Sequence, residues 1–197
     1  VTDSEGTQVT SVESVTVTEF MVPAKMGDYR ISAFNVAFSD LFPNSGEMED
    51  ALKTPGNPGV MAEANIIKKS NPDVLLLNEF NHLWKDDGSF DEAGTLTAVQ
   101  DFVDNYLNIG DDAVAYDHIY IAPCNTGVQS GLDFSKDGTI GDAGDGYGFG
   151  SFPGRYSMVV LSKLPINAEK TRTFQYFLWK DMPNAYLPSN PEDVNGD

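Results

Sequence analysis

Hydrophobic and polar residues alternate in several short segments of the chain, a pattern that is typical of β-strands. Residues 30–36 (RISAFNV), 73–79 (DVLLLNE), 114–121 (VAYDHIYI) and 156–162 (YSMVVLS) show this pattern or a short apolar run. The apolar residues of 73–79 follow one another without a break, which is typical of a strand covered on both faces. The sequence therefore predicts at least four strands, two of them buried.

Two further segments place apolar residues at helical spacing. The first predicts a helix over residues 60–69 that ends at Asn71, because a residue before proline avoids the helical region. The second predicts a helix over residues 96–107 that Gly110 terminates. The apolar positions are Val60, Ala64 and Ile67 in the first helix and Leu96, Val99, Val103, Tyr106 and Leu107 in the second.

The remaining segments are less regular. Residues 1–27 are interpreted as a mobile leader or an exposed edge strand. Residues 42–59 are rich in proline, glycine and asparagine, which predicts a long loop with little more than one turn of helix. The sequence of residues 166–177 is strand-like and predicts a further strand. Residues 125–154 form an insertion rich in glycine and aspartate. Strands that alternate with helices predict sheets covered by helices, and the periodicity leaves open whether the strands pair in parallel or mixed fashion.

Composition limits the classes of function. The 197 residues, 41% of them hydrophobic, suffice for one domain with a sizeable core. A formal net charge of -18 argues against a broad nucleic-acid-binding face. It does not exclude a phosphoester substrate, because a divalent metal ion held by carboxylates reverses the potential locally. The single cysteine, Cys124, excludes an intrachain disulfide, and no apolar run is long enough to span a membrane.

Two polar residues follow predicted strands and are candidates for chemistry. Asn35 ends the segment RISAF, and Glu79 ends DVLLLN. Each alone is ordinary, since Asn is a common turn former and Glu is commonly exposed. The two histidines, His82 and His118, lie in contexts that favour a structural role over catalysis.

The order of these motifs resembles the opening half of the endonuclease/exonuclease/phosphatase superfamily. The superfamily includes deoxyribonuclease-type endonucleases, abasic-site exonucleases, inositol-phosphate phosphatases and sphingomyelinases. The resemblance runs from Tyr29 to Pro165 through FNV, PDVLLLNEF and SMVVLSKLPI, and Asn78 stands where the superfamily usually has glutamine. It implies an α/β (α+β) fold, a β-sandwich of mixed sheets flanked by helices in four αββα layers. Residues 28–197 would be the amino-terminal half of this fold.

The resemblance also implies roles for the candidate residues. Asn35 would contact the metal ion or the scissile phosphate, and Glu79 would bind a divalent ion, Mg²⁺ or else Mn²⁺ or Ca²⁺. The later histidine, Asp-x-Asn and Asp-His motifs of the superfamily do not occur in matching context. We therefore expect that a carboxy-terminal half of the same protein is missing and that this chain alone is inactive.

Two further sites are predicted with their alternatives. Arg155 precedes the segment 156–162 and is suited to bind an anionic substrate, although it is equally suited to an ordinary ion pair. The insertion contains a DxSxDG run that resembles a calcium loop, although Gly144 occupies the twelfth place, where an acid is wanted. The possible calcium ligands are Asp133, Ser135, Asp137, Thr139 and either Asp142 or Asp145.

The sequence thus predicts divalent-metal-dependent hydrolysis of a phosphoester by the full-length protein. The substrate class stays open between a small molecule, a lipid headgroup and a nucleic acid. The main alternative is an extracellular binding module stabilised by calcium and without catalysis. A structural domain without a site would require the order of motifs to be coincidental. We expect an extracellular or periplasmic location, with the signal peptide absent from this chain.

Overall fold

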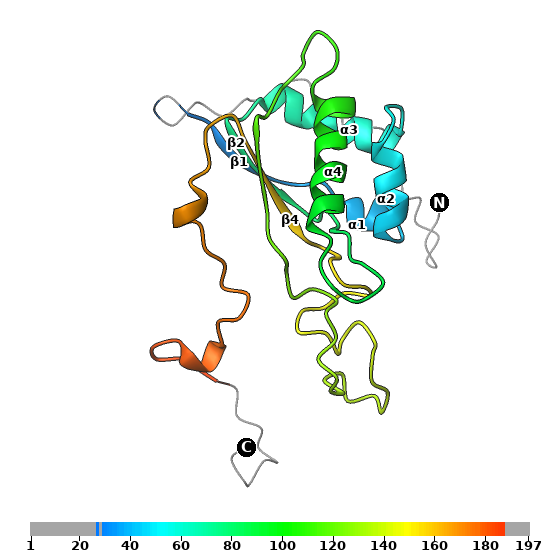
Figure 1. Ribbon diagram of the computed structural model, residues 1–197, viewed down its shortest axis with the longest axis vertical. Helices are drawn as coiled ribbons and strands as arrows, with labels where there is room; N and C mark the ends of the chain where they lie inside the picture. The colour runs from blue at the N-terminus through cyan, green and yellow to red at the C-terminus, as the bar shows by residue number, and fades with distance from the viewer. Residues whose placement is uncertain (1–26, 28, 188–197) are drawn as a thin grey trace, which may run out of the picture.

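The apolar run after Pro72 becomes the central strand of a four-stranded mixed sheet. The computed structural model describes residue 27 and residues 29–187, and the sheet has the strand order β1-β2-β4-β3 (Figure 1). β1 and β2 are parallel, whereas β4 is antiparallel to both β2 and β3. The strands are β1 (Ile31–Asn35), β2 (Val74–Asn78), β3 (His118–Ile121) and β4 (Met158–Ser162).

All the longer helices lie on one side of this sheet (Figure 1). α3 begins where the side chain of Asn57 accepts the backbone N–H groups of Gly59 and Val60, and it ends at Asn71, which has a left-handed conformation. The helices are α1 (Phe38–Leu41), α2 (Ser45–Leu52), α3 (Pro58–Ser70) and α4 (Glu92–Phe102). α4 continues as the π-helical turn η1 (Val103–Leu107), and two 3₁₀ turns, η2 (Ala168–Lys170) and η3 (Trp179–Asp181), follow β4.

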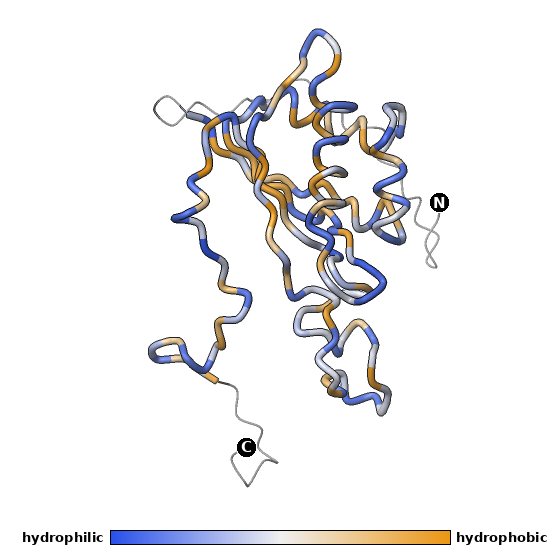
Figure 2. The backbone as a smooth tube through the Cα atoms, viewed as in Figure 1, coloured by the Kyte–Doolittle hydropathy of each residue, from blue (hydrophilic) through white to orange (hydrophobic). Residues whose placement is uncertain are grey.

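The core lies between the sheet and the helices. Figure 2 shows apolar residues along the strands and on the helices that face them. From the strands, the core receives the fully buried side chains of Leu75, Leu77, Val159 and Leu161. Burial of such side chains is the main favourable contribution to folding, at about 1.5–3 kcal/mol each. The alternating residues of the same strands point to the opposite face.

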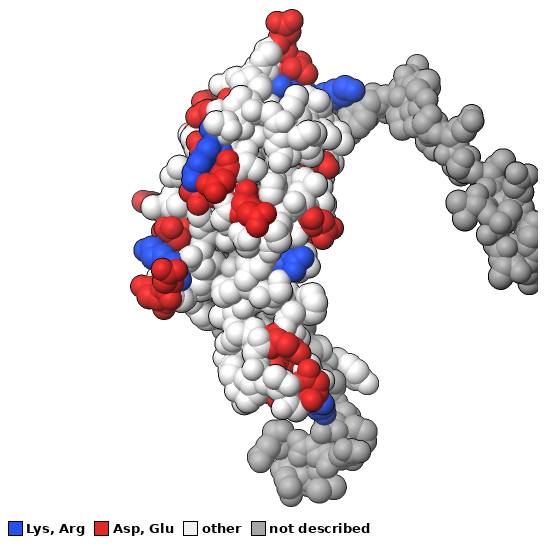
Figure 3. All heavy atoms as spheres, turned by 90° about the vertical axis from the view of Figure 1, so that its right-hand side faces the viewer, with Lys and Arg blue, Asp and Glu red and all other residues white. Residues whose placement is uncertain are grey.

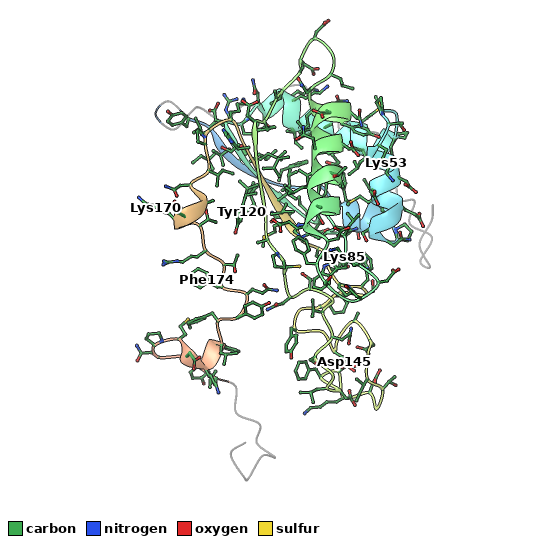
Figure 4. The ribbon with its side chains drawn as sticks, in the orientation of Figure 1. Lys53, Lys85, Tyr120, Asp145, Lys170 and Phe174 are labelled. Atoms are coloured by element: carbon green, nitrogen blue, oxygen red, sulfur yellow. The ribbon has the colours of Figure 1, made fainter. Side chains whose placement is uncertain are left out.

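That opposite face is apolar and only partly covered. Ile31 and Met158 remain 68% and 53% exposed. Met158 also lines a cavity of about 380 Å³ that lies between β2, β3 and β4 and residues 172–175, with Tyr120 and Phe174 among its other lining residues. Figure 4 shows Tyr120 on the side of the sheet where the chain carrying Phe174 passes. Among the described residues, therefore, no second sheet covers this face.

Aromatic rings fill the core beneath the carboxyl ends of β1 and β2. Phe38 of α1 contacts Phe80, just beyond β2, and Phe102 of α4, with a ring separation of 5.4 Å in both pairs. Phe42 and Tyr106 extend the cluster on either side. Because Phe38 and Phe80 are fully buried, they anchor the two segments that carry Asn35 and Glu79.

The structure confirms the α+β class and corrects several details. Residues 42–59 contain the eight-residue helix α2, because Asn44 caps it and Met48 and Leu52 bury one of its faces. Residues 166–177 form no strand, since only the short turn η2 occurs there. Strand β3 begins at residue 118 instead of 114. The possible edge strand in residues 1–27 lies almost wholly outside the described residues.

The insertion at residues 125–154 has no helix or strand of its own. Isolated bridges join Thr126 to Gly148 and Gln129 to Gly146, and backbone hydrogen bonds hold the loop together. Figure 1 shows it projecting beyond the sheet at the end where β4 begins. Within the described part of the chain, no helix is long and apolar enough to cross a membrane.

Candidate active site

Asn35 and Glu79 meet at the carboxyl ends of the two parallel strands. Asn35 pairs with Asn78 in the sheet register, so the following residue, Glu79, lies beside Asn35 at the rim. The side-chain N–H of Asn35 donates to Oε1 of Glu79 at 2.8 Å. The Oδ1 atom of Asn35 accepts the backbone N–H of Ala37 at 2.8 Å, which orients the amide. The two candidate side chains therefore meet at one point of the rim, while their roles in metal binding and catalysis stay predictions.

Glu79 has a backbone conformation that residues with a side chain seldom adopt. Its φ is +60°, in the left-handed region, and Ala37 and Tyr156 beside it also have positive φ values of 49° and 59°. Such conformations are unfavourable and persist only where surrounding contacts impose them. Three of them around one rim indicate that the position of Glu79 is fixed by tertiary contacts.

Arg155 lies beside this rim, on the loop that enters β4. Its guanidinium group donates to the backbone carbonyl of Ser39 at 3.2 Å and to Oγ of Ser151 at 2.7 Å. It also lies 4.7 Å from the centre of the Tyr156 ring, which is a cation–π contact. Ser39 in turn approaches the backbone carbonyl of Glu79, so Arg155 contacts a residue that adjoins the Glu79 turn. No ion pair joins Arg155 to a described carboxylate, and its predicted role in substrate binding is not tested by this geometry.

His82 is a buried side chain and not a solvent-accessible base. Its ring is fully buried, and Nε2–H donates to the backbone carbonyl of Met158 at 3.0 Å. Burial lowers the pKa of His82 to about 4, although the hydrogen bond to Met158 opposes this shift. The imidazole is therefore neutral near pH 7. His118 lies on β3, away from the rim that carries Glu79.

The donor set at the rim suits a hard cation only in part. Glu79 offers its Oε2 atom, which has no hydrogen-bond partner among the described residues, and carboxylate oxygen is a preferred ligand of Mg²⁺. The oxygen of Asn35 accepts the N–H of Ala37 with one of its two lone pairs, so at most one remains for an ion. No group of three or more histidine, cysteine or acidic side chains gathers within the described part of the chain in a way that could hold a metal ion. The rim thus supplies one carboxylate, which is compatible with an ion that keeps several waters and also binds substrate.

The predicted calcium loop is folded through its own backbone. Asp133 accepts the N–H groups of Asp137 and Gly138, and Asp137 accepts that of Thr139. Asp145 is fully buried, and the N–H of Ser135, followed by N–H groups of the 141–142 turn, holds its pKa below the usual value. Figure 4 places Asp145 inside the insertion. The carboxylates are thus engaged with backbone amides, and calcium binding stays a prediction.

The surface on the helix side is predominantly acidic. Figure 3 shows carboxylates spread over this side and at the tip formed by the insertion, with few lysine or arginine side chains between them. This distribution agrees with the net charge of -18. A polyanion such as duplex DNA would be repelled by this face.

An amide and a carboxylate thus meet at the ends of two neighbouring strands, and Arg155 contacts Ser39 beside them. A comparison with protein families finds that the model of the endonuclease/exonuclease/phosphatase family matches residues 33–197. The chain belongs to this family, whose members hydrolyse phosphoester bonds as nucleases or phosphatases and in general use divalent metal ions. No curated protein and no solved structure matched the chain.

Two residues of the rim carry no recognisable signal in the sequence. Ser39 and Asn81 are buried polar side chains that contact the Glu79 turn and the loop before β4. Neither belongs to a recognisable spacing motif, and only the folded arrangement brings them beside Glu79. A buried Ser at the start of a helix and an Asn after a strand are both common without any function.

Proposed function

We propose that this protein is a divalent-metal-dependent phosphoester hydrolase in which Glu79 binds the metal ion and Asn35 orients Glu79. The observation that carries the proposal is the 2.8 Å hydrogen bond between these side chains at the ends of two parallel strands, in a chain of this family. A bound Mg²⁺ or Mn²⁺ would polarise the phosphoryl oxygens and stabilise the leaving group. The amide of Asn35 fixes one carboxylate oxygen, which leaves the other directed to the ion.

Arg155 is proposed to attract the phosphoester to this rim. A guanidinium group suits phosphate oxygens, and Arg155 holds one against Ser39, next to the Glu79 turn, in a protein of strongly negative charge. The stacking on Tyr156 holds the guanidinium group in place before substrate arrives. The overall charge favours a small phosphorylated substrate over a long duplex nucleic acid.

The described residues supply only part of a catalytic centre in this proposal. Hydrolysis needs a group that activates water, and His82 cannot act as that group because it is buried and bonded to the Met158 carbonyl. The half-covered apolar face of the sheet supports the proposal that a second part of the protein packs there and completes the site. We therefore propose that the 197-residue chain alone lacks turnover. Its extracellular or periplasmic location stays a prediction from the sequence.

Metal binding by the chain tests this proposal directly. We expect weak Mn²⁺ binding, followed by electron paramagnetic resonance, that Glu79→Gln weakens by about tenfold or more, because the neutral amide is a poorer ligand. Glu63→Gln, which changes a half-buried glutamate on α3, is the matched control and should leave Mn²⁺ affinity unchanged. An affinity insensitive to Glu79→Gln would refute the assignment. In parallel, an activated phosphodiester with Mg²⁺ should show no turnover by this chain.

A further inference from the structure

If β2 continued in extended conformation, the side chain of Glu79 would point away from the rim. Alternate residues of a strand face opposite sides of the sheet, and Leu75 and Leu77 of β2 are buried beneath the helices. A residue at position 79 in extended conformation would lie on that same buried face. The left-handed backbone of Glu79 breaks the alternation, so the next side chain, Phe80, enters the core and the Glu79 carboxylate meets Asn35.

A buried hydroxyl group joins the three segments that meet at this turn. Ser39, which is 1% exposed, donates from Oγ to Oδ1 of Asn81 at 2.7 Å and accepts the backbone N–H of Tyr156 at 3.2 Å. Its Oγ also lies 3.4 Å from the backbone carbonyl of Glu79. The Oδ1 atom of Asn81, itself fully buried, accepts the same Tyr156 N–H at 3.3 Å. One hydroxyl and one amide oxygen thus tie α1, the turn after β2 and the loop before β4 together.

We propose that Ser39 and Asn81 are positioning residues that hold the backbone of Glu79 in its left-handed conformation and so present its carboxylate to Asn35. The inference rests on the proposed metal-binding role of Glu79. The hydroxyl of Ser39 and the amide oxygen of Asn81 are hydrogen-bonded, whereas the Nδ2 atom of Asn81 is buried without a partner among the described residues. Because the two oxygens would be left unpaired if the segments separated, these contacts favour one arrangement of the three segments. Removal of the Ser39 hydroxyl leaves Asn81 Oδ1 with the Tyr156 N–H alone and frees the Glu79 turn to relax toward extended geometry.

The test compares Ser39→Ala, which lacks the hydroxyl, with Ser39→Thr, which retains it. In the 197-residue chain, NMR chemical shifts and couplings of Glu79 report its backbone conformation, and Mn²⁺ titration reports the affinity of the site. We expect Ser39→Ala to change the Glu79 signals and to weaken Mn²⁺ binding by about tenfold, as loss of a group that orients a ligand does. Ser39→Thr should give the same Glu79 signals and the same Mn²⁺ affinity as wild type, even if its added methyl group lowers thermal stability.

The outcomes separate a positioning role from a general structural one. If Ser39 has only a structural role, Ser39→Ala should have a lower unfolding temperature. Its Glu79 signals and its Mn²⁺ affinity, measured well below that temperature, should then equal those of wild type. This result would overturn the proposal. If Ser39→Ala does not fold, Asn81→Leu, of similar volume, tests the same link. Failure of both variants to fold would also overturn it.

Failure of the proposed function is recognised independently. If Glu79→Gln leaves Mn²⁺ binding unchanged, or if wild type binds no Mn²⁺, then Glu79 is not a metal ligand in this chain. The NMR signals of Glu79 in Ser39→Ala still decide whether Ser39 holds the turn, because that readout needs no metal ion.

Discussion

His82 should make the stability of the folded chain depend on pH. Its ring is fully buried, and burial lowers its pKa from 6.5 to about 4. In the unfolded chain the imidazole is exposed and titrates near its usual value. As the pH falls below about 6.5, the unfolded chain binds a proton that the folded chain cannot bind, so folding becomes less favourable. The loss is complete near the folded pKa of about 4 and absent above pH 7.

The size of this loss follows from the two pKa values. Between pH 7 and pH 5, linkage gives a decrease of about 2 kcal/mol in the free energy of unfolding. For a chain of this length, that corresponds to a decrease of roughly 4–8 °C in the unfolding temperature. Thermal unfolding followed by circular dichroism at matched ionic strength measures it.

Two variants isolate the contribution of His82 from that of the many carboxylates. His82→Gln keeps a side-chain N–H for the Met158 carbonyl but removes the titrating ring. Over the same pH range, its free energy of unfolding should therefore decrease by about 2 kcal/mol less than that of wild type. His118→Gln changes the other histidine, and its free energy of unfolding should decrease as much as that of wild type. The same pH dependence in wild type and His82→Gln would refute the reasoning.

Two other predictions concern the loop that precedes β4 and the insertion. Gly154 and Gly131 both have positive φ, but a Cβ at Gly154 would lie 2.7 Å from atoms of the Trp84 ring, whereas Gly131 faces open space. Urea unfolding should therefore show Gly154→Ala to be less stable than Gly131→Ala by about 2 kcal/mol, and equal losses would contradict the crowding. If the insertion binds calcium, Ca²⁺ should raise the unfolding temperature of wild type but not of Asp133→Ala, and an unchanged wild-type temperature would count against the site.

The parts of the fold that sequence predicted are those with strong local patterns. The run VLLL and the spacing of Val60, Ala64 and Ile67 identified β2 and α3, because burial imposes these periodicities directly. The sequence does not predict helix α2, although Asn44 and the pair Met48 and Leu52 provide a capping and a spacing signal, because glycine and acidic residues interrupt its apolar pattern. Residues 166–177 alternate like a strand but find no pairing partner among the described residues.

The candidate site was predictable only where a residue follows a strand. Asn35 and Glu79 could be placed at strand ends from local sequence, and parallel pairing of β1 and β2 then brings them together. The family pattern was needed to distinguish them from ordinary turn residues. Ser39 and Asn81 could not be predicted, because their contacts join segments far apart in the chain and leave no periodic trace.

Neighbouring strands of this sheet come from distant parts of the chain. Residues 36–73 separate β1 from β2, and residues 79–157 separate β2 from β4. The strands can pair only after these long intervening segments have brought their ends together, which costs chain entropy. The sheet should therefore assemble slowly. During synthesis, the edge of β2 that pairs with β4 cannot be fully covered until residue 162 has left the ribosome, and an unpaired strand edge of this kind is prone to aggregation.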